Sequence, residues 1–199
     1  KHEPFAQVIR ETVAWIDREM TAENGLFYAA LDADSEGVEG KFYIWDKKEF
    51  EQVLGADSTL LADYYNVTDS GNWEEEHSNV LRRTLLDEDL MVKYNLTQES
   101  FQATITAANI KLIAVRNERI KPGLDDKCLT AWNAMMIKAL AEASAILGED
   151  SYYEKAKKAA NFILKNLVNE QGCLYRNYKN DKASISGFLD DYALLIESL

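Results

Sequence analysis

The pattern Leu-Asp-Asp-x-x-Leu occurs twice in this chain, and each copy precedes a strongly apolar segment. The first copy contains Asp125 and Asp126, and the second contains Asp190 and Asp191. Paired carboxylates are the minimal equipment for glycosidic chemistry. An aspartate at a helix N-terminus also accepts hydrogen bonds from backbone N–H groups that lack partners within the helix. Two interpretations therefore stay open for these four residues, catalytic acids facing a cavity and helix caps.

Other polar and aromatic residues extend the candidate site. Trp132 is placed to stack on a sugar ring with Asn133 as its polar neighbour, although packing in the core is the default for both. Lys127 follows the first acid pair and either pairs with a carboxylate or contacts the substrate. The remaining candidates for substrate contact are Trp73, Glu74 and Tyr192, with Asp32, Asp34 and Glu36 at the rim.

The sequence argues against a metal or a cofactor. The acidic segment 32–37 resembles the start of a calcium loop, but an EF-hand requires Glu at the twelfth position, where this chain has Tyr43. A hairpin loop with acids facing solvent or a cavity is favoured over another oxygen-ligated cation. His2 and His77 are too few for a histidine-rich metal site. The sequence contains no phosphate loop, dinucleotide fingerprint or Gly-x-Ser-x-Gly motif, so we expect no metal and no cofactor.

Composition restricts the class of protein. Hydrophobic residues make up 47% of the 199 residues, which suffices for a folded core. A formal net charge of −12 argues against nucleic acid or an anionic membrane as partner. The sequence shows no secretory signal and no membrane-spanning run. The two cysteines, Cys128 and Cys173, lie far apart and fit a reducing compartment, so we expect a cytoplasmic protein.

Hydrophobic periodicity predicts a mainly helical chain. An internal echo at an offset of 147 residues places Ile16, Gly25 and Tyr28 on Ile163, Gly172 and Tyr175. It predicts a repeated helical hairpin, and such hairpins stacked in a ring form an α/α toroid. Helices are expected over 4–20, 46–54, 58–65, 97–119, 128–147 (buried on all sides), 151–167 and after 187. Segments 26–31 and 41–45 are expected to form a β-hairpin, and capping boxes are expected at Asp46 with Glu49 and at Ser151 with Glu154.

Four stretches carry a family resemblance, at residues 24–45, 71–81, 122–137 and 187–193. They read NGLFYAALDADSEGVEGKFYIW, then GNWE with NVL, then PGLDDKCLTAWNAMMI, and finally GFLDDYA. The chain resembles thioredoxin-domain-containing proteins of the YyaL and spermatogenesis-associated type. The resemblance implies a six-hairpin toroid similar to those of N-acylglucosamine 2-epimerases and several glycoside hydrolases, and a thioredoxin-like domain that this chain lacks.

The expected fold is therefore mainly α, a partial (α/α)6 toroid with small β-hairpins at one rim. We expect residues 1–199 to be a single excised fragment of that toroid, because the chain starts at Lys1 and stops at Leu199 inside an apolar helix. Two functions follow from the resemblance. One is a carbohydrate-active domain, a sugar isomerase, epimerase or glycosidase-like enzyme that takes a small sugar. The other is a non-catalytic module accompanying a thioredoxin-like domain. Exposed helix faces of a cut toroid also favour self-association.

Overall fold

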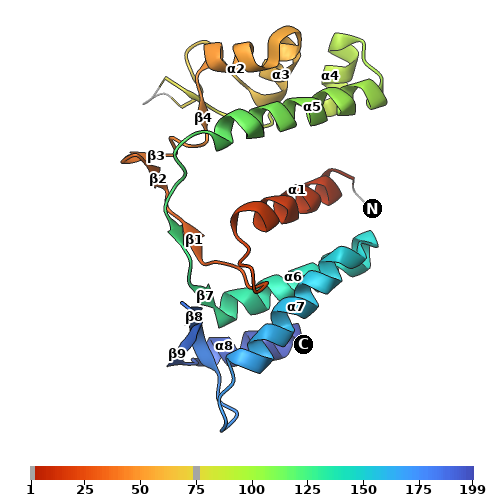
Figure 1. The fold of residues 1–199 in the computed structure, drawn as a ribbon. Coiled ribbons are helices and arrows are strands. Elements are labelled where there is room, and N and C mark those ends of the chain that lie inside the picture. Colours follow the sequence, from red (N-terminus) through yellow and green to blue (C-terminus); the bar gives the residue numbers. More distant parts are fainter. Residues whose placement is uncertain (1–2, 74–76) are drawn as a thin grey trace. The chain divides into compact units, whose positions relative to one another are not determined.

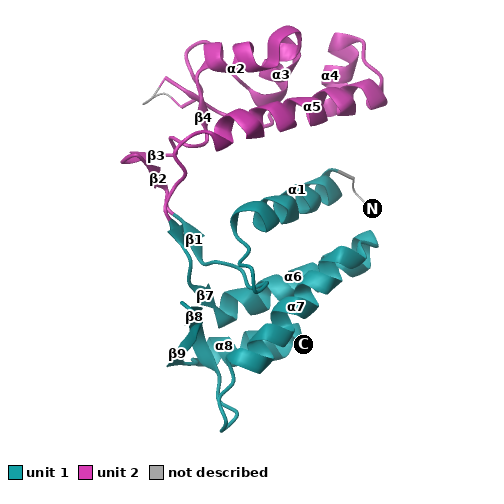
Figure 2. Ribbon diagram, in the orientation of Figure 1, with its two compact units in different colours: residues 1–31, 124–199 teal, residues 32–123 magenta. Residues whose placement is uncertain are grey.

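The computed structural model describes residues 3–73 and 77–199 and divides the chain into two compact units. Unit 1 comprises residues 1–31 and 124–199, and unit 2 comprises residues 32–123 (Figure 2). Unit 2 is thus an insertion between two parts of unit 1. Both units are mainly helical with small antiparallel sheets of two strands or, for β7–β8–β9, three strands, which confirms the predicted class of secondary structure.

The elements follow in chain order along the ribbon of Figure 1. Unit 1 contains α1 (Glu3–Glu19), β1 (Ala30–Leu31), β6 (Leu124–Asp125), β7 (Cys128–Leu129), α6 (Thr130–Leu147), α7 (Asp150–Asn166), β8 (Tyr175–Lys179), β9 (Lys182–Ser186) and α8 (Leu189–Ser198). Unit 2 contains β2 (Asp34–Ser35), β3 (Val38–Glu39), β4 (Ile44–Trp45), α2 (Lys47–Leu54), the short 3-10 helix η1 (Gly55–Asp57), α3 (Ser58–Tyr65), β5 (Asn79–Val80), α4 (Asp87–Tyr94) and α5 (Gln98–Asn117). Helix α4 has no counterpart among the predicted elements.

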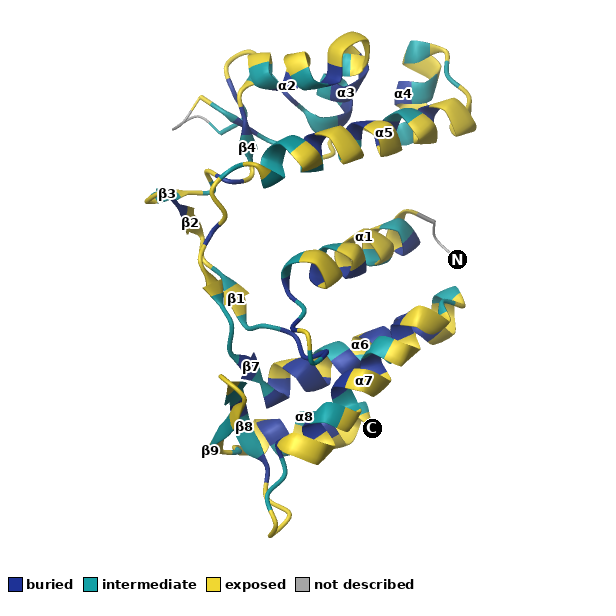
Figure 3. Cartoon of the chain, viewed as in Figure 1, coloured by how far each residue is buried: buried dark blue, intermediate teal, exposed yellow. Residues whose placement is uncertain are grey.

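Helix α6 forms the centre of unit 1 and packs against α7 and α8. Its buried side chains Ala134, Ile137 and Leu140 share one apolar cluster with residues of α1 and α7. The prediction that this helix is buried on all sides is wrong, because Trp132 and Met135 are about half exposed. Figure 3 shows the alternation of buried and exposed residues along α6.

The repeat predicted at an offset of 147 residues is confirmed by matching backbone hydrogen bonds. The N–H of Tyr28 donates to the carbonyl of Met20 at 2.9 Å, and the N–H of Tyr175 donates to that of Leu167 at 2.8 Å. Gly25 also has its counterpart in Gly172, with φ of +92° and +79°, a region that favours glycine. Each copy is therefore a helix, a glycine turn and a strand. The first copy returns through α6 after the inserted unit 2, and the second returns through α8.

The predicted hairpin between 26–31 and 41–45 is wrong. Strand β1 instead pairs antiparallel with β6, and β4 pairs antiparallel with β5. The loop between the two segments forms its own small hairpin, in which β2 pairs with β3. The sequence pattern identified extended segments correctly but assigned the wrong partners, since pairing across a 92-residue insertion leaves no local signal.

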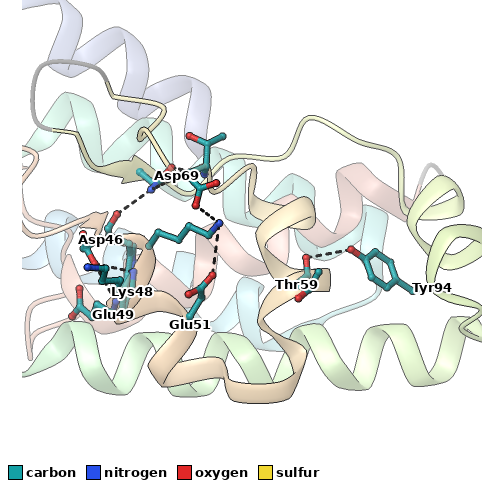
Figure 4. Close-up of polar contacts among 11 residues, drawn as sticks. Asp46, Lys48, Glu49, Glu51, Thr59, Asp69 and Tyr94 are labelled. Carbon is teal, nitrogen blue, oxygen red and sulfur yellow. Dashed lines mark hydrogen bonds and ion pairs between the residues drawn. The ribbon is translucent and has the colours of Figure 1, made fainter.

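Unit 2 is organised around α5, which packs against α2. Phe50, Leu61 and Phe101 are almost completely buried in its apolar cluster. Lys47 at the start of α2 reaches the carboxylates of Asp69 at 2.6 Å and Glu51 at 3.7 Å (Figure 4). The insertion thus has its own hydrophobic core.

Helix starts were predicted with mixed success. Asp46 caps α2 as expected, accepting from the backbone N–H groups of Lys48 and Glu49. The Glu49 side chain does not complete a capping box, because it binds the guanidinium of Arg119 instead. The capping box at Ser151 is wrong, since α7 already begins at Asp150 and Ser151 lies inside its first turn.

Candidate functional site

In the first aspartate pair, Asp125 ends strand β6 and Asp126 lies in the turn before β7, so neither stands at a helix start. Asp125 accepts from the Lys127 ammonium at 2.7 Å, and this hydrogen bond lowers the pKa of the Asp125 carboxyl. Asp126 lies 2.5 Å from the ammonium of Lys179 at the end of β8. Neither aspartate caps α6, so the capping interpretation fails for this copy.

The second pair opens α8, and its two members differ sharply. Asp191 is completely buried, and one carboxylate oxygen accepts from the Phe188 N–H at 2.8 Å. Its other oxygen accepts from the N–H of Ala131 in the first turn of α6, at 3.0 Å. Arg176 donates to Asp191 at 3.2 Å and to the half-exposed Asp190 at 3.3 Å. Asp191 therefore caps two helices at once, whereas Asp190 forms a surface ion pair.

Two predicted contact residues of unit 1 stabilise the fold through hydrogen bonds. The buried Asn133 amide accepts from the Phe27 N–H at 2.7 Å and donates to the Phe27 carbonyl at 2.9 Å. The Tyr192 hydroxyl accepts from the Leu174 N–H at 2.9 Å. Both side chains bind backbone groups, so they hold the segments before β1 and β8 against the helices α6 and α8.

The predicted rim acids belong to unit 2 and point to no metal site. Asp32, Asp34 and Glu36 are exposed, and Glu36 pairs with Lys41 at 2.9 Å. Within the part of the chain that the structure describes, no cluster of His, Cys, Asp and Glu is suited to hold a metal ion. Trp73 packs closely over Gly40, and Glu74 lies outside the described residues.

Unit 1 has a pocket of about 510 Å³ beside the first aspartate pair. The turn after α1, strand β7 and the hairpin β8–β9 form its walls. Its lining includes Glu23, Tyr28, Asp126, Tyr178, Lys179 and Asp181. Asp126 is the predicted catalytic acid that this pocket contains.

Sequence reasoning missed the two tyrosines and Lys179 as site residues. Strand β7 pairs with β8 so that Cys128 lies opposite Tyr178. This register brings Lys179, the next residue on β8, to the turn that carries Asp126. These residues could have been found only from the register of β7 and β8, which the sequence alone does not give.

The two tyrosines and the cysteine of the pocket are neutral at physiological pH, because burial raises the pKa of each. Burial and the nearby Cys128 and Asp126 raise the pKa of the Tyr28 phenol, which is therefore a neutral hydrogen-bond donor at physiological pH. Burial likewise raises the pKa of Tyr178. Burial raises the pKa of the Cys128 thiol to about 11, so this cysteine is not a nucleophile at neutral pH.

The pocket therefore offers neutral phenols beside an ion pair. Phenol hydroxyls donate and accept hydrogen bonds, the carboxylate accepts them and the ammonium donates them. Aromatic residues beside a few convergent polar groups are typical of sites for small ligands. Unit 2 has pockets of its own, among them one of about 730 Å³ along α5 without predicted site residues and one of about 500 Å³ that Glu36 lines.

The chain was compared with known proteins. No family model matches it. It is 32% identical over its whole length to uncharacterized protein B0495.5 of Caenorhabditis elegans, covering 31% of that protein. It is 30% identical over 98% of its length to human spermatogenesis-associated protein 20, covering 29% of it, and equally identical to the rat protein. The chain is homologous to a segment of spermatogenesis-associated protein 20.

This homology confirms the relationship inferred from the four motifs, at the level of a shared segment. The chain spans about 30% of the length of these relatives. No helix among the described residues is long and apolar enough to cross a bilayer.

Proposed function

We propose that unit 1 is part of an (α/α)6 toroid and that its pocket binds a small sugar. The repeated helix, glycine turn and strand support the toroid, because stacked helical hairpins with loops at one end are its building unit. The observation that carries the proposal is the pocket lined by Tyr28, Tyr178 and the Asp126–Lys179 ion pair. Phenol hydroxyls and a carboxylate are the partners that sugar hydroxyls require.

Asp126 is the group to which we assign proton exchange with a bound sugar. Its carboxylate is partly exposed to the pocket, and Lys179 beside it stabilises negative charge that develops on an oxygen. This arrangement supports an isomerase, epimerase or glycosidase-like reaction. Asp191 has no part in it, because its oxygens bind backbone N–H groups and Arg176.

Ligand-detected NMR of the 199-residue chain against glucose and N-acetylglucosamine tests the proposal. We expect binding that weakens at least about tenfold in Tyr28→Phe and in Asp126→Asn, since each change removes a hydrogen bond to the ligand. Asp17→Asn is the matched control, because Asp17 forms a comparable ion pair with Lys155 at 3.0 Å outside the pocket. Equal binding by all the proteins would show that the pocket is not the site.

The alternative is a non-catalytic interaction module accompanying a thioredoxin-like domain. It is favoured by the ion pairs that engage Asp125 and Asp190 and by exposed apolar residues on α6 and α8. Trp132, Leu189 and Ile196 are 49%, 84% and 75% exposed. In this function the chain self-associates or binds a protein through these helix faces. Light scattering that gives a concentration-independent monomer mass would contradict self-association.

A further inference from the structure

The pocket of unit 1 carries an excess of negative charge. Three of its lining residues are carboxylates, namely Glu23, Asp126 and Asp181, and one is an ammonium, Lys179. Lys158 lies at the adjoining turn, where its ammonium donates to the Glu23 carbonyl oxygen at 3.0 Å. Even with Lys158 included, the acids exceed the bases by one. An anionic ligand entering this pocket therefore meets repulsion, and a cationic one meets attraction.

The aromatic walls of the pocket favour a cation as well. Tyr28 and Tyr178 line it from the first and second copy of the repeat. The rings of Tyr178 and Phe162 pack at 84° to each other with centroids 5.0 Å apart, which fixes the orientation of the Tyr178 ring. The faces of such rings attract ammonium groups. Acidic side chains and tyrosines thus gather in one cavity of about 510 Å³, which is large enough for a monosaccharide.

We infer that the ligand of this pocket is a polyhydroxylated compound that carries a protonated amine, with the amine bound at Asp126. The inference rests on the proposed function and narrows its ligand class from sugars in general to amino sugars. Lys179 already occupies one side of Asp126 at 2.5 Å, but the Asp126 side chain is still 44% exposed, so its carboxylate is open to a second cation from the pocket side. A free amine distinguishes this ligand from N-acylated, phosphorylated and carboxylated sugars.

The test compares glucosamine, glucose and glucuronate as NMR ligands at pH 6, where the amine is protonated. We expect glucosamine to bind at least about tenfold more tightly than glucose, as one charge-assisted hydrogen bond provides. Glucuronate is expected to bind most weakly. The preference for glucosamine falls in Asp126→Asn and rises in Lys179→Met, because the second change removes the competing ammonium. Circular dichroism verifies that each variant is folded, and Asp17→Asn is the control.

The outcomes separate this inference from the proposed function. Glucose binding as tightly as glucosamine, with binding lost in Tyr28→Phe, would overturn the preference for an amine and leave the sugar site standing. An unchanged preference in Lys179→Met would also overturn it, because the ammonium would then have no influence on the bound amine. Failure of all three sugars to bind the folded chain would overturn both proposals.

Discussion

Asp191 is predicted to be the most important acid for stability, although it looks identical to its neighbour in the sequence. Its carboxylate joins the first turn of α6 to the start of α8 through Ala131 and Phe188. Arg176 adds a third donor at 3.2 Å. Replacing Asp191 by Ala leaves two backbone N–H groups and a guanidinium without this acceptor, in a place where the residue itself is completely buried.

The expected cost follows from these contacts. Removing one partner of a buried, hydrogen-bonded charge pair costs about 3–5 kcal/mol, and loss of a cap costs about 0.5–2 kcal/mol. These contributions overlap, because the same carboxylate makes all the bonds, so we expect Asp191→Ala to cost about 3–5 kcal/mol in total. Asp190→Ala removes only a surface ion pair, and we expect it to cost less than about 1 kcal/mol.

Urea denaturation followed by circular dichroism, together with hydrogen exchange at the Ala131 amide, measures the difference. Unit 2 has its own core, so denaturation of the whole chain does not show which unit is destabilised. Exchange of the Ala131 amide reports the stability of unit 1 alone. We expect the Ala131 amide to lose protection in Asp191→Ala and to keep it in Asp190→Ala. Equal destabilisation by the two substitutions, or full protection of Ala131 in Asp191→Ala, would refute the assignment of Asp191 as a cap shared by two helices.

Three further predictions concern other parts of the chain. Gly25→Val should lower the free energy of unfolding by more than about 1 kcal/mol, because Gly25 holds φ at +92°; a neutral result in urea denaturation would contradict this. Iodoacetamide at pH 8 should label the exposed Cys173 and spare Cys128, whose pKa burial raises to about 11; labelling of both in the native chain by mass spectrometry would be inconsistent with that burial. Arg119→Lys should cost about 1–3 kcal/mol in unit 2, because lysine has one nitrogen and cannot reach Glu49 and the carbonyls of Phe42 and Ile44 together, and unchanged thermal unfolding would argue against it.

The sequence predicted the repeated framework because its signals are local. Ile16 and Ile163 lie on buried helix faces, and Gly25 and Gly172 form the turns that follow the two helices, so both copies could be recognised within a short window. The insertion of unit 2 could not be recognised that way. Its boundaries depend on β1 pairing with β6, more than 90 residues away along the chain, and no periodicity encodes such a partner.

The candidate site was predicted only in part, for the same reason. The two Leu-Asp-Asp copies have the same residues and spacing, yet the first forms strand β6 and the start of the following turn, and the second opens a helix. Asp191 binds the first turn of α6 through Ala131, 60 residues earlier in the chain. Asp126, at the equivalent position of the first copy, lines an open pocket instead. The local sequence is compatible with an aspartate in a turn and with one at a helix start. Tertiary packing decides which of the two each copy adopts.

The position of the pocket suggests how a repeated scaffold acquires a specific site. Tyr28 comes from the first copy of the repeat, and Tyr178 and Lys179 come from the second. At the same offset of 147 residues, Tyr178 and Lys179 correspond to Leu31 and Asp32, at the point where the chain enters unit 2. The two copies thus share the glycine turn at Gly25 and Gly172 and differ in the residues at the strand ends, where the second copy lines the pocket. Because the pocket needs one wall from each copy, neither hairpin alone could form it, and a ligand bound there would link the stability of the two hairpins.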